Sequence, residues 1–205
     1  MTLKQLIAPA TCAGLLLAAT VTAASAVNVI TNPGFETGDL TGWLVSGAGS
    51  SSGVTVQSPD NGPSAPGTHN AFVDNQAQAL GLTLKQSTLP GSAGPGTVFW
   101  SFDLKLGQAA AGGVFFVEIF AERAGGGVIG GSGLLGNYSP TGWTTFSGSF
   151  VAPANTSFLT IQFEANTAAI VGSISSMHVD NVDLHQDPLV PTQSPSWAVM
   201  KALYR

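Results

Sequence analysis

Hydrophobic and polar residues alternate over short runs along the chain, as they do in half-buried β-strands. In Phe158–Glu164, for example, Leu159, Ile161 and Phe163 alternate with polar side chains. Glycine and proline interrupt the pattern every several residues, which limits each element to the length of a strand. The pattern therefore predicts an all-β chain. The predicted strands are Val27–Ile30, Gly42–Ser46, Val54–Gln57, Asn70–Asp74, Leu80–Gln86, Val98–Leu106, Val114–Glu122, Thr144–Val151, Phe158–Glu164 and Met177–Leu184.

Strands of this number and spacing favour an antiparallel β-sandwich, and a jelly roll in particular. Two irregularities are expected within it. Asp180-Asn181 interrupts the alternation of the last strand, which indicates a β-bulge. The glycine-rich stretch 125–136 predicts a flexible hairpin loop or a bulged strand, since it lacks the Lys-Ser/Thr pair and the following helix of a phosphate-binding loop.

The first 26 residues have the three parts of a secretory signal peptide. Lys4 provides the positive start, Cys12–Val21 the apolar stretch, and Ala24-Ser25-Ala26 the small-residue cleavage site. We therefore expect a secreted protein, extracellular or at the cell surface, that is cleaved after Ala26. The apolar stretch is too short for a committed membrane span.

Composition changes again near the C-terminus. Residues 27–185 make up the predicted jelly-roll domain, and residues 186–205 a proline-rich linker followed by a short tail. Ser196–Arg205 is typical of a short amphipathic helix with Ser196 as its N-cap. It is too short to cross a bilayer, so we expect no membrane span in the mature chain. The tail is either a placement or sorting tag, or an end that frays or folds back onto the domain.

Charge and cysteine content exclude several classes of binding partner, and they exclude disulfide bonds as a source of stability. Only 8% of residues are charged, with eleven Asp and Glu against six Lys and Arg, one of which is Lys4. Without a basic stripe, nucleic acid and anionic membranes are poor partners. The single cysteine, Cys12, lies in the signal segment, so the exported domain has no disulfide and must rely on packing, and on a metal if one binds.

Five motifs in order resemble carbohydrate-binding modules of families 4, 9 and 22, which belong to the galactose-binding-domain-like jelly rolls. The resemblance covers residues 27–185. The motifs are Val29–Glu36 with Leu40–Trp43, Gly67–Val73, Val98–Lys105, Gly142–Phe146 and Val179–Val182. It implies a polysaccharide or other glycan as the partner.

The resemblance also implies a structural calcium ion where the two ends of the sandwich meet. Carried over to this chain, its ligands are the carboxylates of Glu36 and Asp180 and the carbonyl of Gly34. The chemistry is reasonable, because calcium takes six to eight oxygen ligands and can join distant segments. The alternative is that Glu36 caps a turn and Asp180 accepts hydrogen bonds from backbone amides.

A sugar-binding face needs aromatic rings beside amide and carboxylate groups. Alternation places Phe116, Glu118 and Phe120 on one face of their strand, which suits a sugar platform or an ordinary edge of the core. Trp43, Trp100 and Trp143 are expected to pack in the core or against turns. The candidate solvent-facing ligands are Phe116, Glu118, Phe120, Gln86, Asp103 and Gln162.

Catalytic motifs are missing from the sequence. The three histidines lack metal-ligand spacing, no cysteine remains after cleavage, and no G-x-S-x-G elbow occurs. We therefore expect no enzyme. Two hypotheses remain: a secreted carbohydrate-binding protein, or a structural or adhesive surface or matrix protein that self-associates or binds a surface partner through the sandwich.

Overall fold

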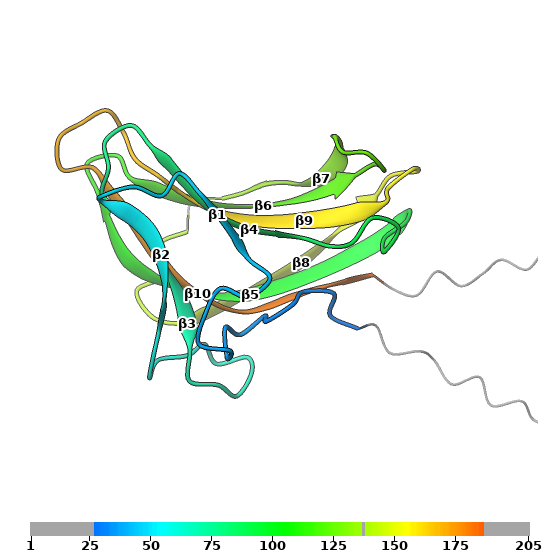
Figure 1. Ribbon diagram of the computed structural model, residues 1–205, viewed down its shortest axis with the longest axis horizontal. Helices are drawn as coiled ribbons and strands as arrows, with labels where there is room; N and C mark the ends of the chain where they lie inside the picture. Colours follow the sequence, from blue (N-terminus) through cyan, green and yellow to red (C-terminus); the bar gives the residue numbers. More distant parts are fainter. Residues whose placement is uncertain (1–26, 137, 187–205) are drawn as a thin grey trace, which may run out of the picture.

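Ten strands form two antiparallel five-stranded sheets that face each other in a computed structural model (Figure 1). The structure describes residues 27–136 and 138–186. Sheet A has the order β1 (Leu44–Ser46), β4 (Gly81–Ser87), β9 (Phe158–Asn166), β6 (Val114–Glu122) and β7 (Val128–Leu135). Sheet B has the order β2 (Ser52–Gln57), β3 (Asn70–Asn75), β10 (Ile174–Gln186), β5 (Gly96–Ala110) and β8 (Thr144–Ala152). The predicted jelly-roll sandwich is confirmed.

The core lies between the sheets because alternate residues of each strand point inward. On β6 and β9 the inward positions are apolar and fully or almost fully buried, while their neighbours face out. An aromatic cluster joins the layers. Phe163 on β9 lies 6.1 Å from Trp43 and 5.5 Å from Phe102 on β5, measured between ring centroids. These contacts hold sheet A onto sheet B.

The tryptophans take the packing positions expected of them, with one difference. Trp43 is buried and Trp100 stacks on Phe102 at a ring distance of 5.3 Å. Trp143 lies outside the sandwich, half-buried over sheet B, where its Nε1 donates a 2.8 Å hydrogen bond to Asp60 Oδ1. It packs against the loop before β3 rather than against the core.

The prediction of a strand over Val27–Ile30 is wrong. The segment runs beside β10, where the Val29 N–H donates to the Leu184 carbonyl at 2.9 Å. The side chain of Asn28 makes the other bonds: it donates to the Val182 carbonyl and accepts from the Leu184 N–H. Because a side chain replaces the backbone ladder, the segment is tied to β10 without becoming part of the sheet.

Both expected irregularities occur. The glycine-rich stretch is a bulged strand, β7, whose register against β6 shifts between Glu118 and Phe120. A side chain at Gly131 is excluded there, since its Cβ would lie 2.2 Å from the Ile119 carbonyl oxygen. The pairing of β10 with β5 shifts after Asp180, and Asn181 adopts a left-handed φ of 48°.

The predicted signal peptide (1–26) and most of the C-terminal tail (187–205) lie outside the described residues. Within residues 27–136 and 138–186, the structure has no helix of the length and apolarity that a membrane crossing requires.

Replacing Phe163 with alanine tests the aromatic contact between the sheets. Phe163→Ala should lower the free energy of unfolding by about 3–5 kcal/mol, because it leaves a cavity where both layers meet. Urea denaturation followed by tryptophan fluorescence measures the change. Phe120→Ala, on the half-exposed outer face of β6, is the matched control and should cost clearly less. Equal losses for the two variants would contradict this account of the core.

Candidate functional site

The outer face of sheet A carries aromatic and polar side chains in register across three strands. On β6, Phe116, Glu118 and Phe120 point away from the core. Their cross-strand neighbours on β9 are Glu164, Gln162 and Thr160, and the next neighbours on β4 are Thr83, Lys85 and Ser87. We call the six side chains on β6 and β9 the platform: Phe116, Glu118, Phe120, Thr160, Gln162 and Glu164.

Hydrogen bonds fix the polar centre of the platform. Gln162 Nε2 donates to Glu118 Oε2 and to Glu164 Oε1, both at 2.8 Å. Thr160 Oγ1 donates to Glu122 Oε1 at 2.5 Å, and its hydroxyl also lies 2.7 Å from that of Ser87. These carboxylate and hydroxyl groups are therefore held in place before any ligand arrives.

The two phenylalanines lie at opposite ends of this polar centre. Phe120 is four positions after Phe116, so their Cα atoms are about 13 Å apart along the strand. Phe120 pairs with Gly131 on β7, which has no side chain to cover the ring from that side. In Figure 1 the strands of sheet A are bowed, with their outer side on the inside of the curve. The platform thus lies on the outer side of a bowed sheet, with Phe116 and Phe120 on either side of Glu118 along β6.

Two predicted ligands do not lie on this surface, and the expectation that they face solvent is wrong. Gln86 on β4 points inward, is 4% exposed, and exchanges hydrogen bonds with the backbone of Thr31. Asp103 belongs to β5 in the other sheet and is fully buried beneath the loop before β3. Its carboxylate accepts from Ser64 and Thr145. Phe116, Glu118, Phe120 and Gln162 do share one face.

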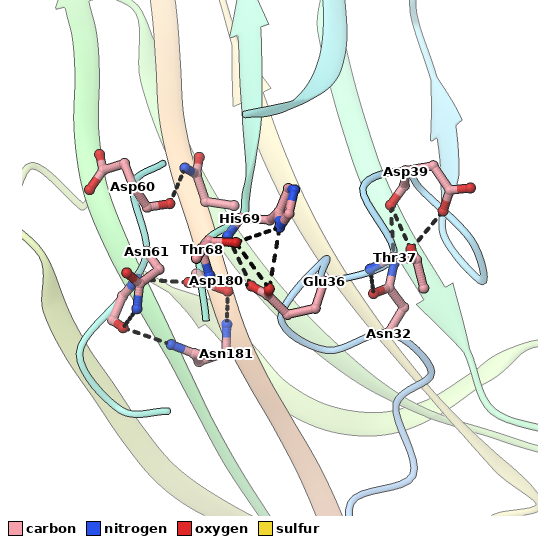
Figure 2. Close-up of polar contacts among 12 residues, drawn as sticks. Asn32, Glu36, Thr37, Asp39, Asp60, Asn61, Thr68, His69, Asp180 and Asn181 are labelled. Atoms are coloured by element: carbon pink, nitrogen blue, oxygen red, sulfur yellow. Dashed lines mark hydrogen bonds and ion pairs between the residues drawn. The ribbon is translucent and has the colours of Figure 1, made fainter. Parts of the chain in front are cut away.

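Glu36 and Asp180, the predicted metal ligands, come from the two ends of the sequence and lie close together in the fold (Figure 2). Glu36 accepts from the backbone N–H groups of Thr68 and His69 at 2.8 and 2.9 Å. Burial acts to raise the pKa of Glu36, but the hydrogen bonds from His69 and Thr68 outweigh it and the pKa is lowered. Glu36 is therefore an ionised carboxylate at the surface end of the cluster.

Asp180 is 1% exposed and receives one backbone N–H on each oxygen, from Gly62 on Oδ2 and Asn181 on Oδ1. Burial and, to a smaller extent, the charges of Asp103 and Glu36 raise the pKa of Asp180 to about 7, against the lowering effect of those two hydrogen bonds. We call Glu36, Asp103 and Asp180 the carboxylate cluster. Its negative charge is only partly balanced by protein groups.

Oxygen atoms converge beside Gly34 in this cluster. A Cβ placed on Gly34 would lie 3.4 Å from Asn181 Oδ1, 3.5 Å from Asp180 Oδ1 and 3.7 Å from Glu36 Cγ. The hydrogen bonds of the Asn181 amide use Nδ2, which donates to Gly62 and Asp103. The space beside Gly34 is therefore bordered by hard oxygen donors, which suit calcium. Among the described residues, no three side chains of His, Cys, Asp or Glu are grouped as a metal site, so carbonyl and amide oxygens would have to complete the shell.

Sequence reasoning missed some members of both regions. Glu164 alternates with Gln162 along β9, so the same pattern could have placed it on the platform. Asn181 lies beside Asp180, yet only the bulge turns its side chain toward Gly34. No sequence signal indicates that the backbone of residues 62–69 would bond to all three carboxylates of the cluster.

No family model and no curated protein matches the chain. Solved structures do. An enzymatically active domain of tailspike protein 4 from bacteriophage CBA120 matches with a TM-score of 0.61, 14% identity and 78% coverage of this chain, which spans only 21% of that one. A cyclase from Fischerella sp. TAU matches with a TM-score of 0.56, 19% identity and coverages of 80% and 98%.

Carbohydrate-binding modules are prominent among the matched structures. A family 61 module in complex with β-1,4-galactotriose matches with a TM-score of 0.51 and 18% identity, over 78% of this chain and 99% of that one. A family 22 module from Clostridium thermocellum also matches. At these identities the likeness concerns the fold alone. The chain has the jelly-roll fold of the carbohydrate-binding modules.

Proposed function

We propose that this protein is secreted and binds extracellular or cell-surface polysaccharide, without catalysis, through the platform on sheet A. The observation that carries the proposal is the arrangement of Phe116 and Phe120 at the two ends of a fixed cluster of Glu118, Gln162 and Glu164. A pyranose has an apolar face that packs on an aromatic ring, and hydroxyls that bond to carboxylates and amides. The module that binds β-1,4-galactotriose has the same fold, which supports this class of ligand.

The spacing of the rings sets the form of the ligand. At about 13 Å apart, Phe116 and Phe120 cannot pack on the same pyranose ring. They would hold two different sugar units of one chain, with the units between them above Gln162. We therefore propose an oligosaccharide segment rather than a single sugar as the ligand.

The hydrogen bonds of the platform also support a binding role over hydrolysis. Glycosidases commonly use two carboxyl groups, one of which must be a protonated acid. Here one amide nitrogen, Gln162 Nε2, bonds to both Glu118 and Glu164, so the two carboxyl groups are held side by side on one open sheet face. Two matched structures are a cyclase and an enzymatically active domain, so the absence of catalysis is part of the proposal.

A calcium ion is the second part of the proposal. Glu36, Asp180 and a Gly34 carbonyl would hold it, with the Asn181 amide oxygen as a further ligand. The convergence of oxygens beside Gly34 supports the site, as does the incompletely balanced charge of Asp180. When bound, the ion would supply positive charge and join the N-terminal segment to β10.

Removing both platform rings tests the sugar site. Phe116→Ala/Phe120→Ala should abolish the retardation of the protein in native gels that contain β-1,4-galactan or xylan, because both stacking faces are lost. Phe99→Ala, a half-buried aromatic on sheet B, is the matched control and should be retarded as the wild type is. Melting temperatures of all proteins are measured in parallel. The platform would be refuted if the double variant were retarded as strongly as the wild type. It would also be refuted if no neutral polysaccharide retarded the wild-type protein.

Calcium should raise the melting temperature, since a ligand that binds only the folded state stabilises it by about 2.7 kcal/mol at one hundred times its dissociation constant. Differential scanning calorimetry in calcium, magnesium and chelator measures the effect. Asp180→Asn should lose most of the calcium response, because it removes a charged ligand. Glu122→Gln changes a carboxylate on the other sheet and should keep it. A wild-type protein with the same melting temperature in calcium and in chelator would refute the metal site.

A further inference from the structure

A pocket lies on the outer face of sheet B, on the opposite side of the sandwich from the platform. It has a volume of about 560 Å³ and is bordered by the loop between β1 and β2 and by the outward side chains of β2 and β3. This volume is within the range of roughly 300–1,000 Å³ that small-molecule sites occupy. Its lining residues are Gly49, Ser50, Ser51, Ser52, Gly53, Thr55, Gln57, Phe72, Asp74 and Gln76.

Phe72 gives this pocket a rigid aromatic wall. Its ring stacks on His178 of β10 at a centroid distance of 4.6 Å and an interplanar angle of 29°. It also reaches β5, where a Cβ on Gly107 would lie 2.8 Å from the ring. Thr55 lies directly opposite Phe72 on β2. The ring is therefore held by contacts with β10, β5 and β2, although it is only half-buried.

Polar groups surround the ring without any cation. Asp74 follows Phe72 on the same face of β3 and accepts a 2.9 Å hydrogen bond from Gln76 Nε2. Gln57 adds a second amide, and Thr55 and the serines of the loop add hydroxyls. None of the lining residues is Lys, Arg or His. The single carboxylate disfavours an anionic ligand, because no positive charge would balance it.

Gly53 keeps the pocket open beside Asp74. The two residues are paired across β2 and β3, and a Cβ on Gly53 would meet nothing within 4 Å. Its φ lies outside the left-handed region, so the backbone does not require glycine here. The space above Gly53 is therefore free for a ligand that contacts Asp74.

We propose that this pocket is a second binding site, for a short neutral saccharide of one or two units. Phe72 packs against the apolar face of one pyranose, while Asp74, Gln76 and Gln57 bond to its hydroxyls. The proposal does not depend on the platform, since the two sites use different strands on opposite sheets. A protein with both sites could contact two saccharide chains at once.

NMR titration of the ¹⁵N-labelled protein tests the pocket. The probes are the methyl glycosides of galactose, glucose, xylose and mannose, and the β-1,4-linked galactose, glucose, xylose and mannose disaccharides, each at millimolar concentration. We expect at least one probe to shift the backbone amides of Thr55, Phe72 and Asp74. The same shifts should persist in Phe116→Ala/Phe120→Ala, which lacks the platform rings.

A side chain at Gly53 provides the decisive variant. Gly53→Gln places a side chain in the open space, where a Cβ would meet nothing within 4 Å, and should keep the fold, since glycine weakens the interior of a strand. It should raise the dissociation constant at these amides at least tenfold. Gly142→Gln is the matched control, because Gly142 also faces open space but lies outside the pocket, and it should bind as the wild type does.

Two outcomes would overturn the second site: no probe shifts these amides, or Gly53→Gln binds as tightly as the wild type. Shifts confined to β6 and β9 would also refute the second site, since the pocket amides would not respond, but they would be consistent with the platform. Shifts confined to β2 and β3, with no binding on sheet A by any polysaccharide, would support this site and refute the platform.

Discussion

Two acidic side chains lie directly opposite each other in the buried part of sheet B, and the surrounding structure must balance their charge. Asp180 on β10 and Asp103 on β5 are partners in the strand register, and neither is more than 1% exposed. Like charges in such positions repel each other. The backbone N–H groups of Gly62 and Ser64 and the amide of Asn181 compensate for part of the charge. The loop before β3 is thereby drawn over this sheet.

The need to balance these buried carboxylates makes the two outer faces of the sandwich different. Asp103 and Asp180 attach residues 62–64 to the strands beneath them, and Glu36 ties Thr68 to the N-terminal segment. Asp60, at the start of the loop, contacts Lys105 and Trp143. That part of sheet B is therefore covered by its own chain. On sheet A, by contrast, every platform side chain except Thr160 is half-exposed. On sheet B, the pocket lined by Phe72 and Asp74 lies at the β2–β3 edge, beyond this loop.

The sequence could predict the strands and their faces, but not which sheet each strand joins. Alternation correctly placed Phe116, Glu118 and Phe120 together, because the period of a strand is independent of its neighbours. The same alternation runs through Leu82, Leu84 and Gln86, and it would have placed Gln86 inward with the leucines. Gln86 is thus a polar residue at a core position, where its side chain bonds to the Thr31 backbone.

The errors at Asp103 and at the N-terminal segment have another cause. Asp103 does point away from the core, as its alternation with Phe102 and Leu104 requires, but it belongs to sheet B and is covered by a loop. Strand order and loop cover depend on contacts between distant residues, which one sequence does not contain. Likewise, no local pattern shows that Asn28 would bond to β10 through its side chain.

A glycine lies beside each of the three candidate sites, and the structural reason for it differs between them. At Gly131 beside Phe120, packing forbids a side chain, since a Cβ would meet the Ile119 carbonyl at 2.2 Å. At Gly34 and Gly53 it does not: a Cβ would make only ordinary contacts at the first and none at the second, and neither residue has a left-handed φ. Gly34 borders the oxygens of the carboxylate cluster, and Gly53 borders Asp74. Neither the backbone nor the core accounts for these two glycines, whereas an ion beside one and a sugar beside the other would use the space that they leave.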